Sequence, residues 1–416
     1  MQQSLSARAA GRPNLAGATV YLKAERQAVP RAYFDHNATT PVDNRVLDAM
    51  LPYYRHVYGN ASSVHGFGQS ARQGVERARR QVAEELGCAA RDLVFTSGGT
   101  ESDNLAVFGT VRGARGRNPH VITSRIEHPA VLNACQQLER EGVDVTYLDV
   151  RPDGVVAPSA VKAALRHETA LVTVMHASNE VGTLQPIREI GAITREAGVL
   201  FHVDGVQSFG KVPTDVNDLG VDLFSLSAHK IYGPKGAGAL FVRRGVQLEK
   251  VQYGGKHERD RRPGTENVPG IVGLGTAAHL AGSDREAEAQ RVGRLRNRLE
   301  EGVLRSVPES HLNCASADRL PNTSSIRFDH VESEPLLISL DLQGFAVSSG
   351  SACSSGAAEP SHVLSAVGLS REQAKSTLRF SLGRQTDAEQ VDSLLALLPG
   401  IVARLRALSP AWAGPA

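Results

Sequence analysis

Seven short apolar runs alternate with helix-patterned stretches from Tyr33 onward, and this alternation limits the fold more than any other feature of the sequence. Such runs are typical of strands buried in a parallel sheet, which need crossover helices between them. The sequence therefore predicts an α/β fold with a mostly parallel, seven-stranded sheet wrapped by helices. The strands are expected at Leu93–Thr96, His120–Thr123, Val145–Leu148, Ala170–Met175, Val199–Val203, Asp222–Leu226 and Gly238–Val242, and helices at Ser70–Leu86, Ala130–Glu141 and Ile187–Ala197.

The pattern changes after about residue 285. A long helix is expected over Glu286–Leu304, followed by mixed segments and a closing helix over Asp387–Leu405. We therefore expect a large domain over residues 45–285 and a smaller α+β domain formed by residues 31–44 and 286–416. Residues 1–30 are rich in Ala, Arg, Ser and Gly with a single acid, which favours a disordered extension. An organelle transit peptide is the alternative, and it would place the protein in the mitochondrial matrix.

Charge and cysteine usage exclude several classes of protein. The 46 basic and 44 acidic side chains nearly balance and are scattered, which disfavours nucleic-acid binding. No stretch approaches the roughly 20 apolar residues of a membrane helix. Four cysteines without a CxxC pair argue against a zinc site or a disulfide framework, and for a reducing compartment. We expect a cytoplasmic protein.

Polar residues recur just after the predicted strands, where ligands bind in open α/β sheets. A Gly-rich turn, Ser97–Glu101, opens a helix, and its N–H groups would suit a phosphate, although a plain capping turn explains it equally well. It matches neither GxGxxG nor a Walker motif. Further strand ends carry His128, Asn179 and Asp204, each of which alone has a structural interpretation. Their recurrence at one edge favours a site.

Lys230 ends another predicted strand, in a chain with eight Lys against 38 Arg. A partly desolvated lysine amine deprotonates readily and can bind a carbonyl cofactor covalently. A salt-bridged structural lysine is an equally good interpretation of this segment alone. If Lys230 carries pyridoxal phosphate, Asp204 would bond the ring nitrogen, and the phosphate would be held by Gly99, Thr100, Ser227 and His229.

Nine segments in order resemble one family, the cysteine desulfurases of the NifS/IscS type. This family lies within the class V aminotransferase group of fold-type I pyridoxal phosphate enzymes, and the resemblance runs from about Tyr33 to Trp412. The segments are Asp35–Pro41, Thr96–Asn104, Glu127–Val131, Met175–Gly182, His202–Ser208, Ser227–Gly236, Arg262–Asn267, Ser348–Ser354 and Leu378–Gly383.

The resemblance implies a role for each matching residue. Lys230 would bind the coenzyme, His128 would stack on its ring and assist proton transfer, and Cys353 would be the nucleophile. Arg379 would clamp the substrate carboxylate, with Asn179 beside it. Coenzyme contacts would come from Gly99, Thr100, His128, Asn179, Asp204, Gln207, Ser227, His229, Lys230 and Thr265. Thr265 would reach the coenzyme of a partner subunit, which implies a homodimer.

The residues around Cys353 support its role independently. The stretch 348–356 is small and polar, whereas structural cysteines prefer apolar settings. The loop resembles that of the long-loop group, whose cysteine delivers sulfur directly to a scaffold or carrier protein as a persulfide and would be a transient iron–sulfur ligand. We interpret Cys88, Cys135 and Cys314 as structural.

The resemblance predicts that the protein removes sulfur from L-cysteine to give L-alanine. A related class V enzyme, such as a selenocysteine lyase or an aminotransferase, is the alternative, and it would not need Cys353. A dehydrogenase and a non-enzymatic sulfur carrier fit less well. The sulfur acceptor stays open between iron–sulfur assembly, tRNA thiolation and nitrogenase. Gly205 departs from the family's usual Ala or Thr, and we expect it to loosen the turn that aims Asp204.

Overall fold

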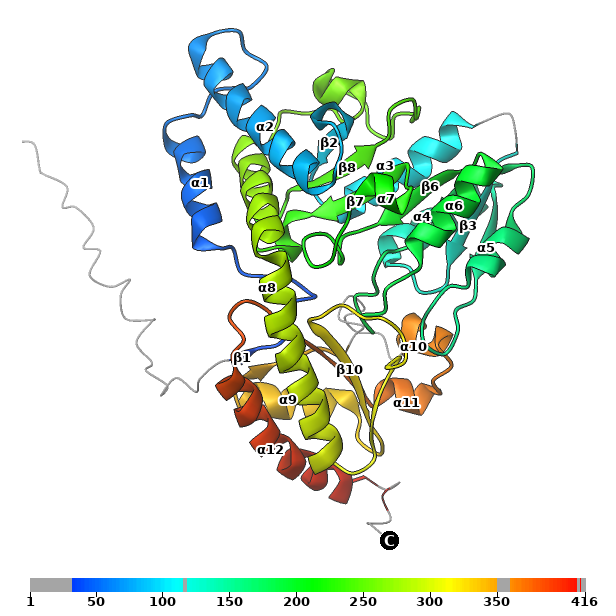
Figure 1. Ribbon diagram of the computed structural model, residues 1–416, viewed down its shortest axis with the longest axis vertical. Helices are drawn as coiled ribbons and strands as arrows, with labels where there is room; N and C mark the ends of the chain where they lie inside the picture. Colours follow the sequence, from blue (N-terminus) through cyan, green and yellow to red (C-terminus); the bar gives the residue numbers. More distant parts are fainter. Residues whose placement is uncertain (1–31, 115–117, 350–359, 410–411, 413–416) are drawn as a thin grey trace, which may run out of the picture.

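One long helix, α8 (Val268–Ser306), runs through both lobes of the molecule (Figure 1). The structure, a computed structural model, describes residues 32–114, 118–349, 360–409 and 412. The first half of α8 contributes to the apolar core of the larger lobe, and Leu299 and Val303 in its second half contribute to that of the smaller lobe. The division of the chain at residues 44 and 285 stays a prediction, and residues 1–30 lie outside the described residues.

The larger lobe contains the predicted seven-stranded sheet, in the order β2-β8-β7-β6-β5-β3-β4. Its strands are β2 (Leu93–Thr96), β3 (His120–Ser124), β4 (Asp144–Leu148), β5 (Thr169–Thr173), β6 (Leu200–Asp204), β7 (Leu223–Ser227) and β8 (Gly238–Val242). Strands β3 to β7 pair in parallel, so the mostly parallel sheet is confirmed. The carboxyl ends of these strands therefore share one edge.

Strand β8 departs from the predicted arrangement. It pairs antiparallel with both β2 and β7, so the expectation that Gly238–Val242 runs parallel is wrong. The connection from β7 to β8 spans residues 228–237 and contains only the short 3-10 turn η4 (Ala228–Lys230). A parallel return needs a crossover of about a dozen or more residues, usually a helix. This reversal leaves Lys230 on the short connection at the carboxyl end of β7.

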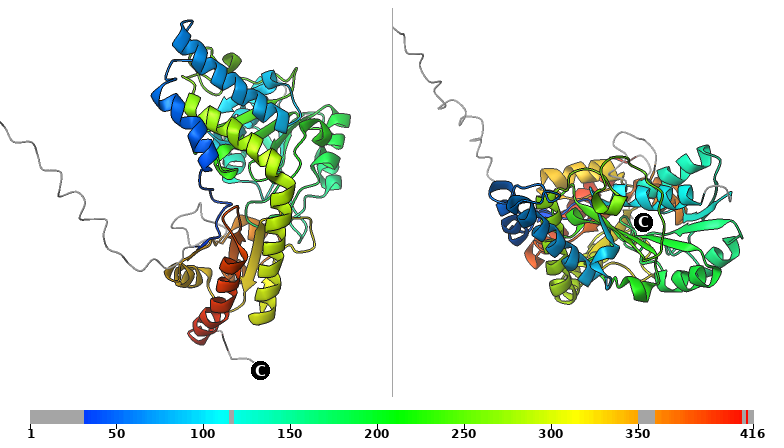
Figure 2. Two further views of the ribbon diagram at one scale, coloured as in Figure 1. Left: turned by 60° about the vertical axis from the view of Figure 1, so that its left-hand side comes forward. Right: turned by 90° about the horizontal axis from the view of Figure 1, so that it is seen from above.

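Helices cover the sheet at nearly the predicted positions. Helix α2 starts at Gly66, four residues before the predicted start, because His65 Nδ1 caps it by accepting from the Gly68 N–H at 3.3 Å. Helices α1 and α2 pack against the first half of α8 (Figure 2). The helices are α1 (Asn44–Arg55), α2 (Gly66–Glu85), α3 (Gly99–Gly113), α4 (Pro129–Arg140), α5 (Pro158–Ala164), α6 (Ile187–Ala197) and α7 (Val216–Leu219).

The smaller lobe has its own apolar core and a three-stranded antiparallel sheet in the order β12-β10-β9. The predicted α+β content is present. The strands are β1 (Ala32–Tyr33), β9 (Ser310–Leu312), β10 (Thr323–Phe328), β11 (Phe345–Ala346) and β12 (Thr377–Ser381), and the helices are α9 (Ser333–Leu342), α10 (His362–Ala366), α11 (Arg371–Lys375) and α12 (Ala388–Ala407). Strand β1 pairs in parallel with β11, so the start of the described chain belongs to this lobe. No helix in the described part of the chain is long and apolar enough to cross a membrane.

A buried ion pair fixes the loop that precedes α8. Arg79 on α2 donates two hydrogen bonds to Glu258, at 2.9 and 2.6 Å, on the short turn η5 (His257–Asp260). Both side chains are almost fully buried, with 4% and 3% of their surfaces exposed. Glu258 also accepts from the Phe95 N–H at 2.8 Å, which ties the turn to β2. Removing one partner of such a pair leaves an uncompensated charge in the interior.

We expect Arg79→Met to lower the free energy of unfolding by about 3–5 kcal/mol, because Glu258 stays buried without its cation. Urea unfolding of the purified protein without added ligands measures this. Arg80→Met is the matched control, since Arg80 is exposed on the same helix. Equal stability of the two variants would contradict a role for the buried pair.

Candidate active site

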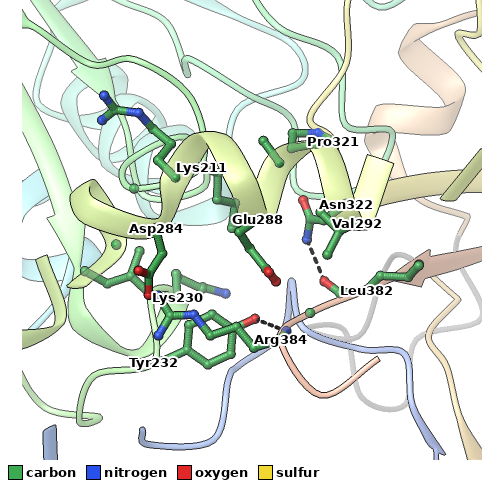
Figure 3. Close-up of a pocket in the computed structure, with 16 residues that line it drawn as sticks. Lys211, Lys230, Tyr232, Asp284, Glu288, Val292, Pro321, Asn322, Leu382 and Arg384 are labelled. Carbon is green, nitrogen blue, oxygen red and sulfur yellow. Dashed lines mark hydrogen bonds and ion pairs between the residues drawn. The ribbon is translucent and has the colours of Figure 1, made fainter. Parts of the chain in front are cut away.

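Lys230 lies where the two lobes meet. Its Nζ donates to the carbonyl oxygens of Asn37 and Ala38, at 2.6 and 2.9 Å, on the segment between β1 and α1. Figure 3 shows its side chain extended beside Tyr232, Glu288 and Arg384, with which it lines a small cavity of about 50 Å³. The predicted catalytic lysine thus sits at a lobe interface rather than on the outer surface.

Asp204 is the last residue of β6, the strand next to β7. It is buried, and its Oδ1 accepts from the Val206 N–H at 2.9 Å. Burial raises the pKa of Asp204, whereas the nearby His128 imidazole and the Lys230 ammonium act to lower it. The sheet therefore brings these three predicted residues into one electrostatic neighbourhood.

His128 caps the N-terminus of α4. Its Nδ1 accepts from the Ala130 N–H at 3.1 Å, so the neutral ring carries its proton on Nε2. Burial lowers the pKa of His128, and the charge of Lys230 lowers it further, although Asp204 opposes both. The ring is therefore held in one orientation by the helix terminus and presents Nε2 as its proton-carrying atom.

The predicted anion-binding turn stands at the start of α3. The first N–H groups of a helix have no partner within it, and the helix dipole makes them attract anions. At Gly99 a Cβ would lie 2.7 Å from Val206, so glycine lets this terminus pack against the turn that follows Asp204. Thr100 lies in the first turn of the helix, and Ser227 Oγ would be 3.7 Å from a Cβ at Gly98. These groups suit a phosphate.

His229 directly precedes Lys230 in the chain. Its Nδ1 is hydrogen-bonded to Thr39 Oγ1 at 3.1 Å, and its carbonyl accepts from Thr40. Burial, together with the charge of Lys230, lowers the pKa of His229 to about 4. It therefore acts as a neutral hydrogen-bonding group near neutral pH.

Arg379 lies in the middle of β12 with only 3% of its side chain exposed. Its Nη2 donates to Asp35 Oδ1 at 2.6 Å and its Nη1 to the Asn179 carbonyl at 3.0 Å. Its Nε is buried and has no hydrogen-bond partner within the described residues. The guanidinium is thus fixed at the lobe interface, where Asn179 belongs to the larger lobe and Asp35 to the smaller.

A hydrogen bond that the sequence did not reveal joins Gln207 and Lys211. Lys211 Nζ donates to Gln207 Oε1 at 2.8 Å, and Gln207 Nε2 donates to the Asn37 carbonyl at 2.8 Å. That carbonyl also accepts from Lys230. Burial, reinforced by the cations Lys230 and Arg379, lowers the pKa of Lys211 to about 7. Only the scarcity of lysine in the sequence hinted at Lys211.

Two buried acids near Asp204 were also missed. Asp103 on α3 is fully buried, 3.6 Å from the ring of His202, and burial raises its pKa well above the usual value, which the charge of Asp204 reinforces. Burial raises the pKa of Glu127 to about 8, and its Oε1 accepts from Ser124 and from the Met175 N–H. Both acids stand in the segments that carry the family resemblance, but burial is not visible in a sequence.

Gly205 is packed rather than loose. A Cβ at this position would lie 1.9 to 2.5 Å from atoms of the Phe224 ring, which fills the space where an alanine side chain would be. The turn is further fixed by the Gly205 N–H, which donates to the Ser225 carbonyl at 3.0 Å. The expectation that glycine loosens the turn after Asp204 is therefore wrong, because Phe224 on β7 compensates for the missing methyl group.

The predicted nucleophile Cys353 lies outside the described residues, but both segments beside residues 350–359 are anchored at the site. The Ser348 backbone pairs with that of Arg379, and Ser361 donates to buried Glu180 at 2.6 Å. Thr265 lies on the exposed loop before α8 and does not line the cavity at Lys230.

The other three cysteines make poor nucleophiles. Burial raises the pKa of Cys88 and Cys135 to about 12 and that of Cys314 to about 11, so their thiols stay protonated near neutral pH. No group of three or more potential metal ligands occurs among the residues that the structure describes.

Comparison with known proteins gives a consistent family. Residues 32–394 match the aminotransferase class-V family. A protein named cysteine desulfurase IscS from Anaeromyxobacter sp. (strain Fw109-5) is 51% identical over 383 residues, covering 91% of this chain and 94% of its own. One of the same name from Methanosarcina thermophila is 47% identical over 378 residues, covering 91% and 93%.

Solved structures agree with the sequence relatives. A structure described as a NIFS-like protein superposes with a TM-score of 0.85 at 38% identity, covering 90% of this chain and 100% of its own. Another, described as SspA in complex with cysteine, has a TM-score of 0.75 at 37% identity and covers 84% of this chain and 98% of its own.

The depressed pKa of Lys211 predicts a pH-dependent stability. Below pH 7 the amine is charged in the folded and the unfolded protein, so folding bears the cost of burying a charge. Between about 7 and the ordinary value of 10.5, the unfolded chain binds the extra proton, and stability rises with pH. Lys211→Met removes this dependence, so its stability relative to the wild type should be highest below pH 7 and should fall as the pH rises.

Urea unfolding of the coenzyme-free protein between pH 6 and 9 measures this difference. Lys235→Met is the matched control, because Lys235 is exposed on the same lobe. A stability difference between Lys211→Met and the wild type that does not change with pH would contradict the depressed pKa.

Proposed function

This chain belongs to the aminotransferase class-V family, and from that membership, its relatives and the site around Lys230 we infer that it is a pyridoxal phosphate-dependent cysteine desulfurase. The reaction removes sulfur from L-cysteine and releases L-alanine. The observation that carries this function is the convergence of a lysine amine, a buried carboxylate and an anion-binding helix terminus at one sheet edge.

Pyridoxal phosphate fits this donor set. The carboxylate of Asp204 is buried and its pKa is raised, and a protonated ring nitrogen would supply the opposite charge that the carboxylate needs. The terminus of α3, with Gly99, Thr100 and Ser227, suits the phosphate. When bound, the coenzyme supplies an electron sink for negative charge that develops on the substrate. The same edge of the sheet also carries three further polar residues that could contact the coenzyme, namely Gln207, Asn179 and His229.

Three residues of the chain bind the coenzyme, transfer protons and bind the substrate carboxylate. Lys230 would hold the coenzyme through its Nζ and, when that amine is free, would accept or return protons there. His128 holds a proton on Nε2 and assists these transfers. Arg379 receives the substrate carboxylate, for which its planar guanidinium is suited.

We place the sulfur-accepting thiol at Cys353. Its thiolate attacks the substrate sulfur, so the carbon–sulfur bond breaks, a sulfur–sulfur bond forms, and the three-carbon product takes up protons and leaves as alanine. The raised pKa values of the other three thiols support this assignment, because those thiols stay protonated and are poor nucleophiles. The persulfide then passes to an acceptor protein for iron–sulfur assembly or thiolation.

The assembly and the location stay predictions. We propose a homodimer in which Thr265 of each subunit reaches the partner's coenzyme, and its exposure on the loop before α8 leaves it available for such a contact. The cytoplasmic location rests on cysteine usage in the sequence.

Alanine release from L-cysteine by the purified, coenzyme-saturated protein tests the function. The wild type should be yellow and should turn over, whereas Lys230→Ala should lose its visible band and its activity, because no amine remains to hold the coenzyme. Lys235→Ala, which changes an exposed lysine, is the control. Continued turnover of cysteine by Lys230→Ala would remove the central assignment.

Arg379→Lys should not behave as a conservative change. An ammonium cannot present two parallel donors to a carboxylate, so we expect kcat/KM for cysteine to fall by the equivalent of about 2–4 kcal/mol. Steady-state kinetics measure this, with the visible band confirming that the coenzyme is bound. Unchanged kinetics would mean that the carboxylate is held elsewhere.

A further inference from the structure

The carboxylate clamp Arg379 already holds a carboxylate of this chain. Asp35 Oδ1 lies 2.6 Å from Arg379 Nη2, and the side chains are 19% and 3% exposed. A cation as buried as this one needs an anion beside it, because desolvation without compensation is costly. In the absence of substrate, Asp35 supplies that anion.

Asp35 is held in place by the backbone. The Ser381 N–H donates to the Phe34 carbonyl at 2.8 Å, and the His36 N–H donates to the Ser381 carbonyl at 3.1 Å. These two bonds fix Asp35 beside β12, two residues along the strand from Arg379. The backbone of Asp35 therefore keeps its carboxylate within reach of the guanidinium, and both residues belong to the same lobe.

The rest of the guanidinium is only partly satisfied. Nη1 donates to the Asn179 carbonyl at 3.0 Å, whereas Nε is buried without a hydrogen-bond partner among the described residues. Among the described residues, a neutral carbonyl and one carboxylate oxygen thus leave a buried N–H group of Arg379 unpaired, which is unfavourable. A ligand carboxylate with two oxygens in line would satisfy more of the donors than Asp35 does.

We propose that Asp35 is a positioning residue that stands in for the substrate carboxylate and that an arriving amino acid must displace it from Arg379. This inference rests on the proposed function, in which Arg379 receives the substrate carboxylate. Amino-acid binding then exchanges the carboxylate of Asp35 on Arg379 for the carboxylate of the ligand. The observed association constant for an amino acid is then the intrinsic constant multiplied by the fraction of molecules in which Asp35 does not occupy Arg379.

This exchange predicts an unusual direction for the change in ligand affinity when Asp35 is substituted. Removing the charge of Asp35 should strengthen the binding of a ligand with a carboxylate, whereas losing a merely structural contact would weaken it. Ligands without a carboxylate do not compete with Asp35, so their affinity should not change. L-Alanine and ethylamine form a matched pair for this purpose, because they differ only by the carboxylate.

The experiment titrates each ligand into the coenzyme-saturated wild type, Asp35→Asn and Asp35→Ser and follows the visible band of the coenzyme. We expect both variants to bind L-alanine about fivefold or more tightly than the wild type does, with ethylamine unchanged. Asp149→Asn is the control, because Asp149 pairs with Arg125 on the surface, where its side chain is 85% exposed.

Weaker or unchanged alanine binding in both variants would overturn the proposal, and so would an equal change for ethylamine. If neither variant folds, as judged by urea unfolding and coenzyme uptake, the pair is a fixed structural element and cannot be exchanged, which also overturns it. Cysteine turnover by the wild type is measured in parallel. If the wild type releases no alanine from cysteine, the proposed function fails by itself, independently of Asp35.

Discussion

The site depends on Asn37, which connects the two lobes with nearly every polar atom that it has. Its carbonyl accepts from Lys230 and Gln207 of the larger lobe, at 2.6 and 2.8 Å. Its N–H donates to Ser381 Oγ, and its side-chain amide donates to Thr323 Oγ1, both at 2.9 Å, in the smaller lobe. Because a buried residue with so many bonds cannot shift alone, the position of Lys230 is set by the docking of one lobe on the other.

Electrostatics explains how several ionisable groups share so small a region. Burial raises the pKa of Asp204, Asp103 and Glu127 and lowers that of His128 and Lys211, so most of these groups are pushed toward their neutral forms. Such opposed shifts cluster where proton transfer is needed. In the same region, Arg379 has the carboxylate of Asp35 as its direct partner.

The sequence predicted the sheet, which is confirmed, and the polar residues at its edge, but not the contacts across the lobes. Apolar runs predict buried strands, yet they carry no direction, and so the reversal of β8 was missed. The start of α8 was missed because glycines at 270, 273 and 275 weaken its helical pattern, although a Cβ at Gly275 would lie 2.5 Å from Ala78, so glycine permits close packing there. Lys230, Asp204 and His128 were predicted from their strand ends. Asp35 and Asn37 were only members of a motif, because their partners lie hundreds of residues away.

In the proposed reaction, sulfur leaves cysteine by way of a thiol on this chain. Mixing the holoenzyme with one equivalent of L-cysteine, quenching with an alkylating agent and mapping the peptides by mass spectrometry tests it most directly. We expect one extra sulfur atom on the peptide that contains Cys353, formed together with an equal amount of alanine. Alanine formed without any protein persulfide, or a persulfide on Cys88, Cys135 or Cys314 instead, would contradict it.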